Sequence, residues 1–505
     1  MAITLLIFCV HMIYAQQYFD VTKYGAKKDS SAKATAAIKK AIDAASKAGG
    51  GTVYFPAGKY LTGPIHLKSN ITIFIDAGAE LHFSDDFDDY LPMVESRYEG
   101  VDVMSFSPLF YAYKAENIAI LGRGKINGHG KKWWDFVEGY KKDQPRSKWQ
   151  YISDSLNKNI LLPDDPAQMK RGFLRPPFIQ PMYCKNILIE GITITNSPFW
   201  TINPEFCENI TVNAVTIDNP LSPNTDGINA ESCKYVHVSN CHISVGDDCI
   251  TIKSGKDLPG RTKNMPAEDY TITNCTMLNG HGGVVIGSEM SGGVKKIVIT
   301  NCVFDGTDRG IRIKTTRGRG GVVEDIRVDN IVMKNIKQQA IVLDMQYTKA
   351  VEEPLSERTP QFRNIRLSNI TAYTKQAMYI NGLDEMPVSE VSLNDVVFEA
   401  ETGIVIKNAK DIELHNVRVN TRTGSALQAE KTERLDINGL LSAKPIAYVP
   451  LIKLNNVQDV MLRNCWPFNG TKIFTTVNGA ETKNVKLMNN ELGEAMVVYG
   501  VEVKK

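Results

Sequence analysis

Several features are scarce in this 505-residue sequence, and each scarcity excludes a class of protein. After residue 15, no stretch approaches the run of about 18 apolar residues that a transmembrane helix needs. Lys and Arg number 58 and Asp and Glu 56, so the net charge is only +2 and no overall positive field favours nucleic acid. Helical periodicity is confined to one short stretch near the N-terminus. A preference for an acidic ligand must therefore come from a local group of residues.

The first residues hold a short apolar run, from Ile3 to a small residue at Ala15. It is too short to span a membrane, and it lacks the Lys or Arg that usually precedes the apolar part of a leader. We predict that residues 1 to 16 are a signal peptide and that the protein is secreted or periplasmic. Residues 17 to 505 are predicted to form a single domain.

One amphipathic helix is predicted near the start of this domain. Apolar residues from Ala34 to Ala45 recur at helical spacing, and Gly49-Gly50-Gly51 would end the helix. A stacked array of repeats needs its open end covered. We therefore interpret residues 17 to 69 as an N-terminal cap region with a capping helix.

The rest of the chain is a repeat of short strands. Each copy opens with a polar residue and continues with alternating Ile, Val or Leu, as in Asn117-Ile118-Ala119-Ile120 and Asn209-Ile210-Thr211-Val212. Most copies start about 21 to 29 residues apart, and no helical pattern separates them. This spacing predicts an all-β fold, a right-handed parallel β-helix, rather than a sandwich or a propeller. Each repeat would be one coil, and coils would stack about 4.8 Å apart.

Two segments interrupt the repeat. Residues 84 to 108 are acidic and aromatic, and residues 131 to 178, an inserted loop region, contain Trp133, Trp134 and Trp149. Long insertions in a regular scaffold usually carry function. We expect both segments to form the wall at one end of a cleft.

Most cysteines follow the same repeat. Cys241, Cys275, Cys302 and Cys465 lie six residues after a repeat start, and Cys184, Cys207 and Cys233 lie two residues before one. Stacks of small apolar side chains are the favoured interpretation. Neighbouring coils would also bring Cα atoms within disulfide range, so disulfides formed in an oxidising compartment are the alternative.

Four polar clusters occupy the middle of the chain: Asn224-Thr225-Asp226, Gly246-Asp247-Asp248, Gly280-His281-Gly282 and Arg312-Ile313-Lys314. Aligning the coils on a second apolar strand makes Asp226 level with Asp248, and Asp247 level with His281. Strand alternation turns Ile313 inward, and Arg312 and Lys314 outward. The four clusters are therefore predicted to form one outward patch.

The chemistry of this patch suits cleavage of an acidic sugar chain. Glycosidic hydrolysis needs one carboxylic acid and one carboxylate. Mutual repulsion among Asp226, Asp247 and Asp248 would raise the pKa of at least one of them. Arg312 and Lys314 would pair with a carboxylate of the ligand. Each cluster alone is ordinary turn or strand sequence, so the prediction depends on their joint occurrence in register.

The ordered set of four motifs resembles the signature of the glycoside hydrolase family 28 polygalacturonases, over roughly residues 18 to 420. The resemblance implies a right-handed parallel β-helix, no metal or other cofactor, and hydrolysis of α-1,4 linkages of galacturonic acid with inversion. The roles it implies are Asp247 as general acid, Asp226 and Asp248 as the pair that activates water, His281 as a supporting imidazole, and Arg312, Lys314, Asn224 and Tyr347 as substrate-binding residues. Inverting enzymes usually hold their two carboxyl groups about 6.5 to 9.5 Å apart.

The mode of attack is predicted from further resemblance. The insertion at 131 to 178, the run Arg175-Pro176-Pro177 and the pair Phe199-Trp200 resemble exo-acting bacterial members of the family. Trp200 would stack on a sugar ring or serve as a core aromatic. The expected partner is a galacturonate-containing pectic oligosaccharide or polysaccharide, with no nucleic acid, no membrane span and a monomeric enzyme.

Three other functions stay open on the sequence. A rhamnogalacturonan hydrolase would share fold and mechanism. A β-helix pectate lyase would use calcium and a basic residue and leave an unsaturated product. A non-catalytic, glycan-binding β-helix would have no need of three carboxylates in register.

Overall fold

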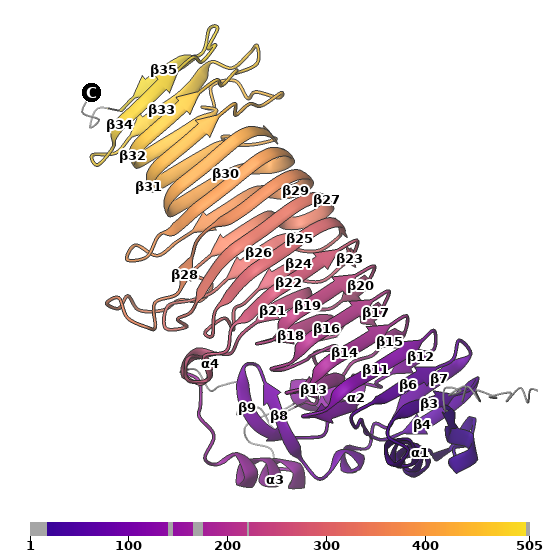
Figure 1. Cartoon of the computed structure of the whole chain (residues 1–505). Coiled ribbons are helices and arrows are strands. Elements are labelled where there is room, and N and C mark those ends of the chain that lie inside the picture. The colour runs from indigo at the N-terminus through magenta and orange to yellow at the C-terminus, as the bar shows by residue number, and fades with distance from the viewer. Residues whose placement is uncertain (1–17, 140–144, 165–174, 220–221, 501–505) are drawn as a thin grey trace, which may run out of the picture.

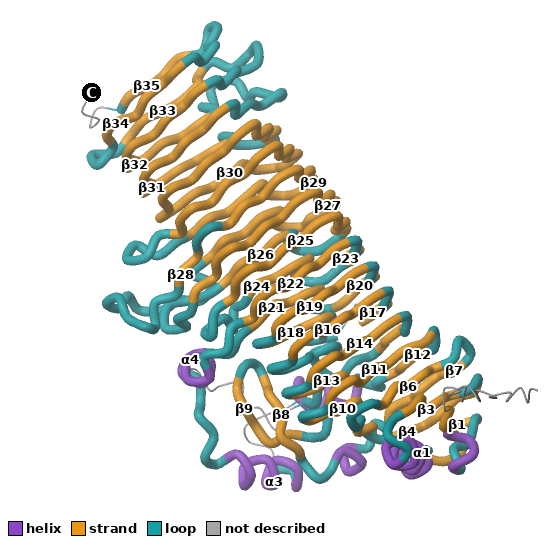
Figure 2. The backbone as a smooth tube through the Cα atoms, in the orientation of Figure 1, coloured by secondary structure: helices purple, strands orange, loops and turns teal. Residues whose placement is uncertain are grey.

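Most of the chain forms one long stack of parallel strands (Figure 1). The computed structural model describes residues 18–139, 145–164, 175–219 and 222–500. The predicted signal peptide lies outside these residues. The prediction of an all-β parallel β-helix is confirmed, and the few helices lie beside the N-terminal half of the stack (Figure 2).

Three faces run along the stack, and every pairing within them is parallel. The first face begins with β1 (Tyr18–Asp20), β3 (Gly51–Phe55), β6 (Ile71–Ile75), β11 (Glu116–Gly122), β14 (Lys185–Glu190), β16 (Glu208–Asn213), β19 (Lys234–Ser239) and β22 (Ala267–Thr273). The second begins with β2 (Asp29–Lys33), β4 (Gly58–Thr62), β7 (Ala79–Phe83), β12 (Lys125–Asn127), β15 (Thr193–Thr195), β17 (Thr216–Asn219), β20 (His242–Val245) and β23 (Thr276–Leu278). The third begins with β5 (Ile65–His66), β10 (Phe110–Tyr113), β13 (Ile179–Met182), β18 (Ile228–Glu231), β21 (Asp248–Lys253), β24 (Gly282–Ile286) and β26 (Ile311–Lys314).

Longer strands continue these faces toward the C-terminus. They are β25 (Val294–Asp305), β27 (Val322–Asp344), β29 (Ile365–Asn381), β30 (Val388–Thr421), β31 (Leu427–Asn438) and β32 (Ile452–Arg463). Several pass from one face to the next without a break, since their residues pair in more than one face. Short strands complete the stack: β28 (Gln361–Phe362), β33 (Ile473–Asn478), β34 (Lys483–Met488) and β35 (Met496–Tyr499).

The interior is built from columns of apolar residues, one from each coil. In the first face, Ile187 pairs with Ile210, which pairs in turn with Val236. All three are buried, while the residues between them along each strand face outward. This period of two is the pattern that predicted the strands, and burial of each inward column is what holds neighbouring coils together.

From β6 onward, a residue in a left-handed conformation, most often Asn or Asp, lies at the start of the first-face strands. Asn117, Asn186 and Asn209 have φ between 54° and 59°, a region that Asn tolerates better than most residues. Their side-chain amides also bond from coil to coil: Asn186 donates to Asn117 at 2.9 Å and Asn209 donates to Asn186 at 2.8 Å. These asparagines therefore have two roles: they form the turn into the strand, and their side chains link neighbouring coils by hydrogen bonds.

The predicted capping helix is α1 (Thr35–Lys47), and its buried positions include Ala37, Ile38 and Ala41 as the spacing indicated. It packs against β1 and β3. The stack itself starts earlier than the repeat seen in the sequence, because β1 and β3 already pair in register. These first strands lack the regular Asn-led consensus that marks the later coils.

The eight described cysteines are buried free thiols. The backbone N–H of Cys184 donates to Sγ of Cys207 at 3.3 Å, and that of Cys207 to Sγ of Cys233 at 3.4 Å. The stacked small side chains favoured from the sequence are thus what the structure contains, and the disulfide alternative is absent among these residues.

Additional elements decorate the N-terminal half. They are η1 (Val21–Tyr24), η2 (Phe87–Tyr90), α2 (Lys131–Glu138), α3 (Lys148–Asn157), α4 (Asp257–Lys263) and an antiparallel hairpin of β8 (Val94–Tyr98) and β9 (Val101–Ser105). Asn157 in α3 accepts from the backbone N–H of Met104 at 2.7 Å, which fixes α3 to the hairpin. Among the residues that the structure describes, no helix is long and apolar enough to cross a membrane.

Candidate active site

The predicted alignment of the aspartates is confirmed by strand register. Ile228 pairs with Ile250, which makes Asp226 level with Asp248. Asp248 pairs with Gly282, and the backbone N–H of His281 donates to the carbonyl of Asp247 at 2.9 Å. The third face thus brings together residues that are far apart in the sequence.

The three carboxylates form a compact group. Each of Asp226, Asp247 and Asp248 offers an oxygen, and these oxygens lie within 4.8 Å of one another. Asp226 and Asp248 are each only 2% exposed, whereas the Asp247 side chain is 18% exposed. Their closest oxygens are nearer than the spacing of about 6.5 to 9.5 Å expected between the carboxyl groups of inverting enzymes. Such a group also has the donors that a divalent cation would need.

Basic side chains of this chain already neutralise the group. Lys314 Nζ lies 2.9 Å from Oδ2 of Asp248, and Arg312 lies 3.8 Å from Oδ1 of the same residue. Arg312 and Lys314 lie on the outer side of the coil, while Ile313 is in the core. The Tyr347 ring is 5.3 Å from both cations and is 43% exposed. Two cations and an accessible aromatic ring therefore lie beside the carboxylates.

Lys253 is a further cation at the site that the sequence reasoning missed. Its Nζ lies 3.5 Å from Asp226 and 3.2 Å from Glu289, and the residue is buried. Strand alternation contained the signal, because inward Ile250 and Ile252 turn Thr251 and Lys253 outward. Nothing in the sequence indicated that an outward lysine would be covered.

The surroundings move the pKa values of these groups in different directions. Burial raises the pKa of Asp226 well above its usual range, and the charges of Asp247 and Asp248 add to this, against the opposing effect of Lys253. Burial also acts to raise the pKa of Asp247, but the hydrogen bond from His281 and nearby positive charges outweigh it and lower the pKa. The same bond, 3.1 Å from Nδ1 to Oδ1, raises the pKa of His281. In the free protein, Asp226 is thus the favoured holder of a proton.

Asn224 is held in place by the inserted segment. Arg175 donates to Oδ1 of Asn224 at 2.8 Å and to the carbonyl of Pro223 at 2.9 Å. Asn224 in turn donates to Oδ2 of Asp247 at 3.4 Å. The run Arg175-Pro176-Pro177 noted in the sequence therefore supports the first motif of the patch.

Trp200 does not present an open face to solvent. It is only 3% exposed, its ring stacks on Phe199 at 4.9 Å, and Lys253 Nζ lies 3.9 Å from its ring centroid. Phe199 also stacks on Tyr98 of the hairpin at 4.6 Å. This burial leaves no room for a sugar ring on Trp200, so of the two sequence interpretations the core aromatic fits the structure. Its contacts link the hairpin to Lys253.

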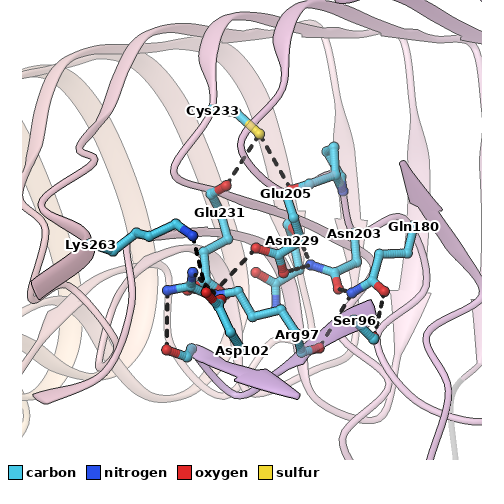
Figure 3. A network of polar contacts seen from close by, with 12 residues as sticks. Ser96, Arg97, Asp102, Gln180, Asn203, Glu205, Asn229, Glu231, Cys233 and Lys263 are labelled. Carbon is cyan, nitrogen blue, oxygen red and sulfur yellow. Dashed lines mark hydrogen bonds and ion pairs between the residues drawn. The ribbon is translucent and has the colours of Figure 1, made fainter. Parts of the chain in front are cut away.

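The hairpin also covers the third face beside the aspartates through a buried ionic network (Figure 3). Arg97 is 1% exposed, and its Nε lies 2.9 Å from Glu231 and 3.7 Å from Glu205. Both glutamates are fully buried. Burial raises the pKa of Glu205, and the charge of Glu231 adds to this. The third face of the coils preceding the carboxylate group is therefore covered by the hairpin at Arg97.

A parallel β-helix that displays clustered aspartates among fixed cations has the paired carboxyl groups that a glycoside hydrolase needs. The chain belongs to the glycosyl hydrolases family 28, whose family model matches residues 165–423. A second model, rhamnogalacturonase A/epimerase, pectate lyase-like, matches residues 18–127.

Individual relatives agree with this assignment. A probable polygalacturonase of Vitis vinifera is 34% identical over 62% of this chain, which spans 60% of that protein's length. An endo-polygalacturonase of Pectobacterium carotovorum is 29% identical over 75% of this chain and 88% of that protein. The crystal structure of an exopolygalacturonase from Thermotoga maritima matches with a TM-score of 0.71 and 33% identity, over 79% of this chain and 91% of that one.

Proposed function

We propose that this enzyme hydrolyses α-1,4 linkages of galacturonic acid and releases terminal galacturonate from oligogalacturonides. The observation that carries the proposal is the contact of the carboxylate group with Lys314 and Arg312, beside the accessible ring of Tyr347. Uronate carboxylates pair with such cations, and sugar rings pack on exposed aromatic faces.

In the proposed mechanism, Asp247 is the general acid and Asp226 and Asp248 activate the attacking water. The pKa of Asp247 is lowered in the free protein, so the acid has to gain its proton when substrate binds. A bound uronate adds negative charge and excludes water, and both effects raise the pKa of a neighbouring carboxyl group. Asp226, whose pKa is raised, has an oxygen within 4.8 Å of an Asp247 oxygen, a distance that one bridging water spans for transfer of the proton.

Exo attack is supported by the closed end of the site. The hairpin β8–β9 and its Arg97 network cover the third face of the coils before Asp226, which favours a site that holds a chain end rather than the middle of a polymer. The likeness to the Thermotoga exopolygalacturonase points the same way, whereas the Pectobacterium relative is named as an endo enzyme.

The test is incubation with trigalacturonate and with polygalacturonate, followed by chromatography of the first products. We expect monomer from both, with little early loss of viscosity. An Asp247→Asn variant with an unchanged melting temperature should lose about 10²- to 10⁴-fold in kcat. Rapid loss of viscosity with few new reducing ends would overturn the exo mode, and normal turnover by the variant would overturn the acid assignment.

We propose inversion at the anomeric carbon, following the family resemblance. The compact carboxylate group makes a direct measurement necessary, since a spacing of about 5 to 5.5 Å is typical of retaining enzymes. Proton NMR of the first-formed product should show the β-anomer before mutarotation. Initial appearance of the α-anomer would refute inversion without affecting the substrate assignment.

A rhamnogalacturonan hydrolase is the second candidate, favoured by the match of residues 18–127 to the rhamnogalacturonase A/epimerase model. The same chromatographic assay with rhamnogalacturonan oligosaccharides separates the two. Faster cleavage of that substrate than of trigalacturonate would make it the primary activity.

We also propose that the enzyme acts outside the cytoplasm, on the basis of the apolar leader-like run at Ile3 to Ala15, and that it works as a monomer. N-terminal sequencing of the exported protein and its mass in solution test these two proposals.

A further inference from the structure

A charged groove lies along the same corner of the coil as Asp247 and His281, farther toward the C-terminus. It has a volume of about 480 Å³ and is lined by residues from several successive coils. Its charged lining consists of Lys337, Lys375, Arg422 and Lys444, opposed by Glu399 and Glu401. Cations thus outnumber carboxylates by four to two.

Strand register connects the groove to the active site. Val284 pairs with Ile311, which makes His281 level with Asp308. The backbone N–H of Gln338 donates to the carbonyl of Asp308 at 2.8 Å. One coil later, Gln339 pairs with Gln376, which places Lys375 beside Gln338. Three coils of about 4.8 Å put Lys375 about 14 Å along the axis from His281.

Two of the groove cations are available to a ligand. Lys444 pairs with Glu399 at 2.9 Å and Lys337 with Asp308 at 3.4 Å, whereas Lys375 and Arg422 form no ion pair with any residue in the described parts of the chain. The ring of Tyr373, in the same groove, is 52% exposed. Unpaired cations beside an open aromatic face suit a chain of acidic sugars.

We propose that this groove binds the distal part of an acidic polysaccharide, a run of uronate sugars whose terminal unit occupies the site at Asp247. The inference rests on the proposed function. Because the hairpin covers the third face of the coils before Asp226, the remainder of a bound chain would leave the site toward the C-terminal coils, where the groove lies. The groove would therefore favour long substrates over short ones.

The test is the double variant Lys375→Glu/Arg422→Glu, assayed on trigalacturonate and on an oligogalacturonate of about twelve units. We expect kcat/KM for the long substrate to fall about tenfold while that for the trimer is unchanged. The matched control is Lys483→Glu/Lys486→Glu on β34, which changes the net charge equally on exposed residues away from the groove. The control should retain the preference of the wild type for the long substrate.

The groove proposal would be overturned if the variant had the same kcat/KM as the wild type for both substrates. It would also be overturned if the variant lost as much kcat/KM on the trimer as on the long chain. Failure of the wild type to cleave trigalacturonate would instead overturn the proposed function. In that case the groove is judged by direct binding of the twelve-unit oligomer, which the variant should bind about tenfold more weakly than the wild type. Equal binding by the two proteins would overturn it there as well.

Discussion

Lys253 joins two carboxylates that belong to different coils, one buried (Asp226) and one partly buried (Glu289). It contacts Asp226 on one side and Glu289 on the other. Burial raises the pKa of Glu289 by itself, but Lys253 and other nearby cations outweigh it and lower that pKa strongly. The lysine is therefore a positioning residue that keeps negative charge possible at Asp226.

Replacing Lys253 by Met should move the acidic limb of the kcat–pH profile to higher pH. Loss of the ammonium raises the pKa of Asp226 further, and in the proposed mechanism Asp226 has to be ionised to activate water. Breaking a buried ion pair costs about 3 to 5 kcal/mol, so the measurement is made in Lys253→Met/Glu289→Gln, in which the second carboxylate is also neutral. Glu289→Gln alone is the control. If the kcat–pH profile of the double variant were identical to that of this control, the positioning role of Lys253 would be contradicted.

Asp226→Asn should stabilise the protein at neutral pH while abolishing activity. The folded pKa of Asp226 is raised above its unfolded value of about 3.9, so the native state holds more protons than the unfolded state. Stability is then lost as the pH rises above about 4. Removing the carboxylate should raise the melting temperature by about 1 to 3 °C at pH 7 and by nothing near pH 3.5.

The measurement is thermal unfolding across pH, and Asp85→Asn, at an exposed aspartate, is the matched control. A melting-temperature difference that did not grow with pH would count against a raised pKa at Asp226.

The hairpin β8–β9 is the element that sets the end of the site. Replacing residues 96–103 by two glycines should open the closed end, so that polygalacturonate yields oligomers as well as monomer. Glu205→Gln and Glu231→Gln are included, because both carboxylates would otherwise stay buried without Arg97.

The matched control keeps the hairpin and carries Arg97→Met with the same two glutamine substitutions. Chromatography of early products should show monomer alone from this control. If the shortened variant also released only monomer, a segment other than the hairpin would have to close the site.

The direction of side chains along a strand could be predicted from the sequence, whereas the cover over those side chains could not. Alternation of Ile with polar residues indicated the inward and outward sides of β21 and β26, and the register of β24 between them followed from aligning the coils. The cover over Lys253, Trp200 and Glu231 could not be predicted in the same way. It comes from a hairpin of residues 94–105 that docks through Tyr98 and Arg97, and such non-periodic contacts leave no pattern in the sequence.

At the scale of the whole molecule, stability rests on stacked coils and not on covalent links. Thiol titration of the native protein should therefore show no reaction of the eight described cysteines, which are buried, and complete reaction after denaturation. A reductant should leave the melting temperature unchanged. A lower melting temperature with reductant would indicate that coils are bridged in the mature protein.

The coils share one register, and the residues to which we assign the acid and base roles lie between Asn224 and Lys314. Coils beyond Tyr347 can therefore be duplicated or lost without changing the distances among Asp226, Asp247 and Asp248. If the proposed groove holds the polymer, the length of chain that is held and the reaction that cuts it are set by different coils and can change separately. Gain or loss of a single repeat is the simplest route by which descendants of this enzyme would adapt to longer or shorter chains.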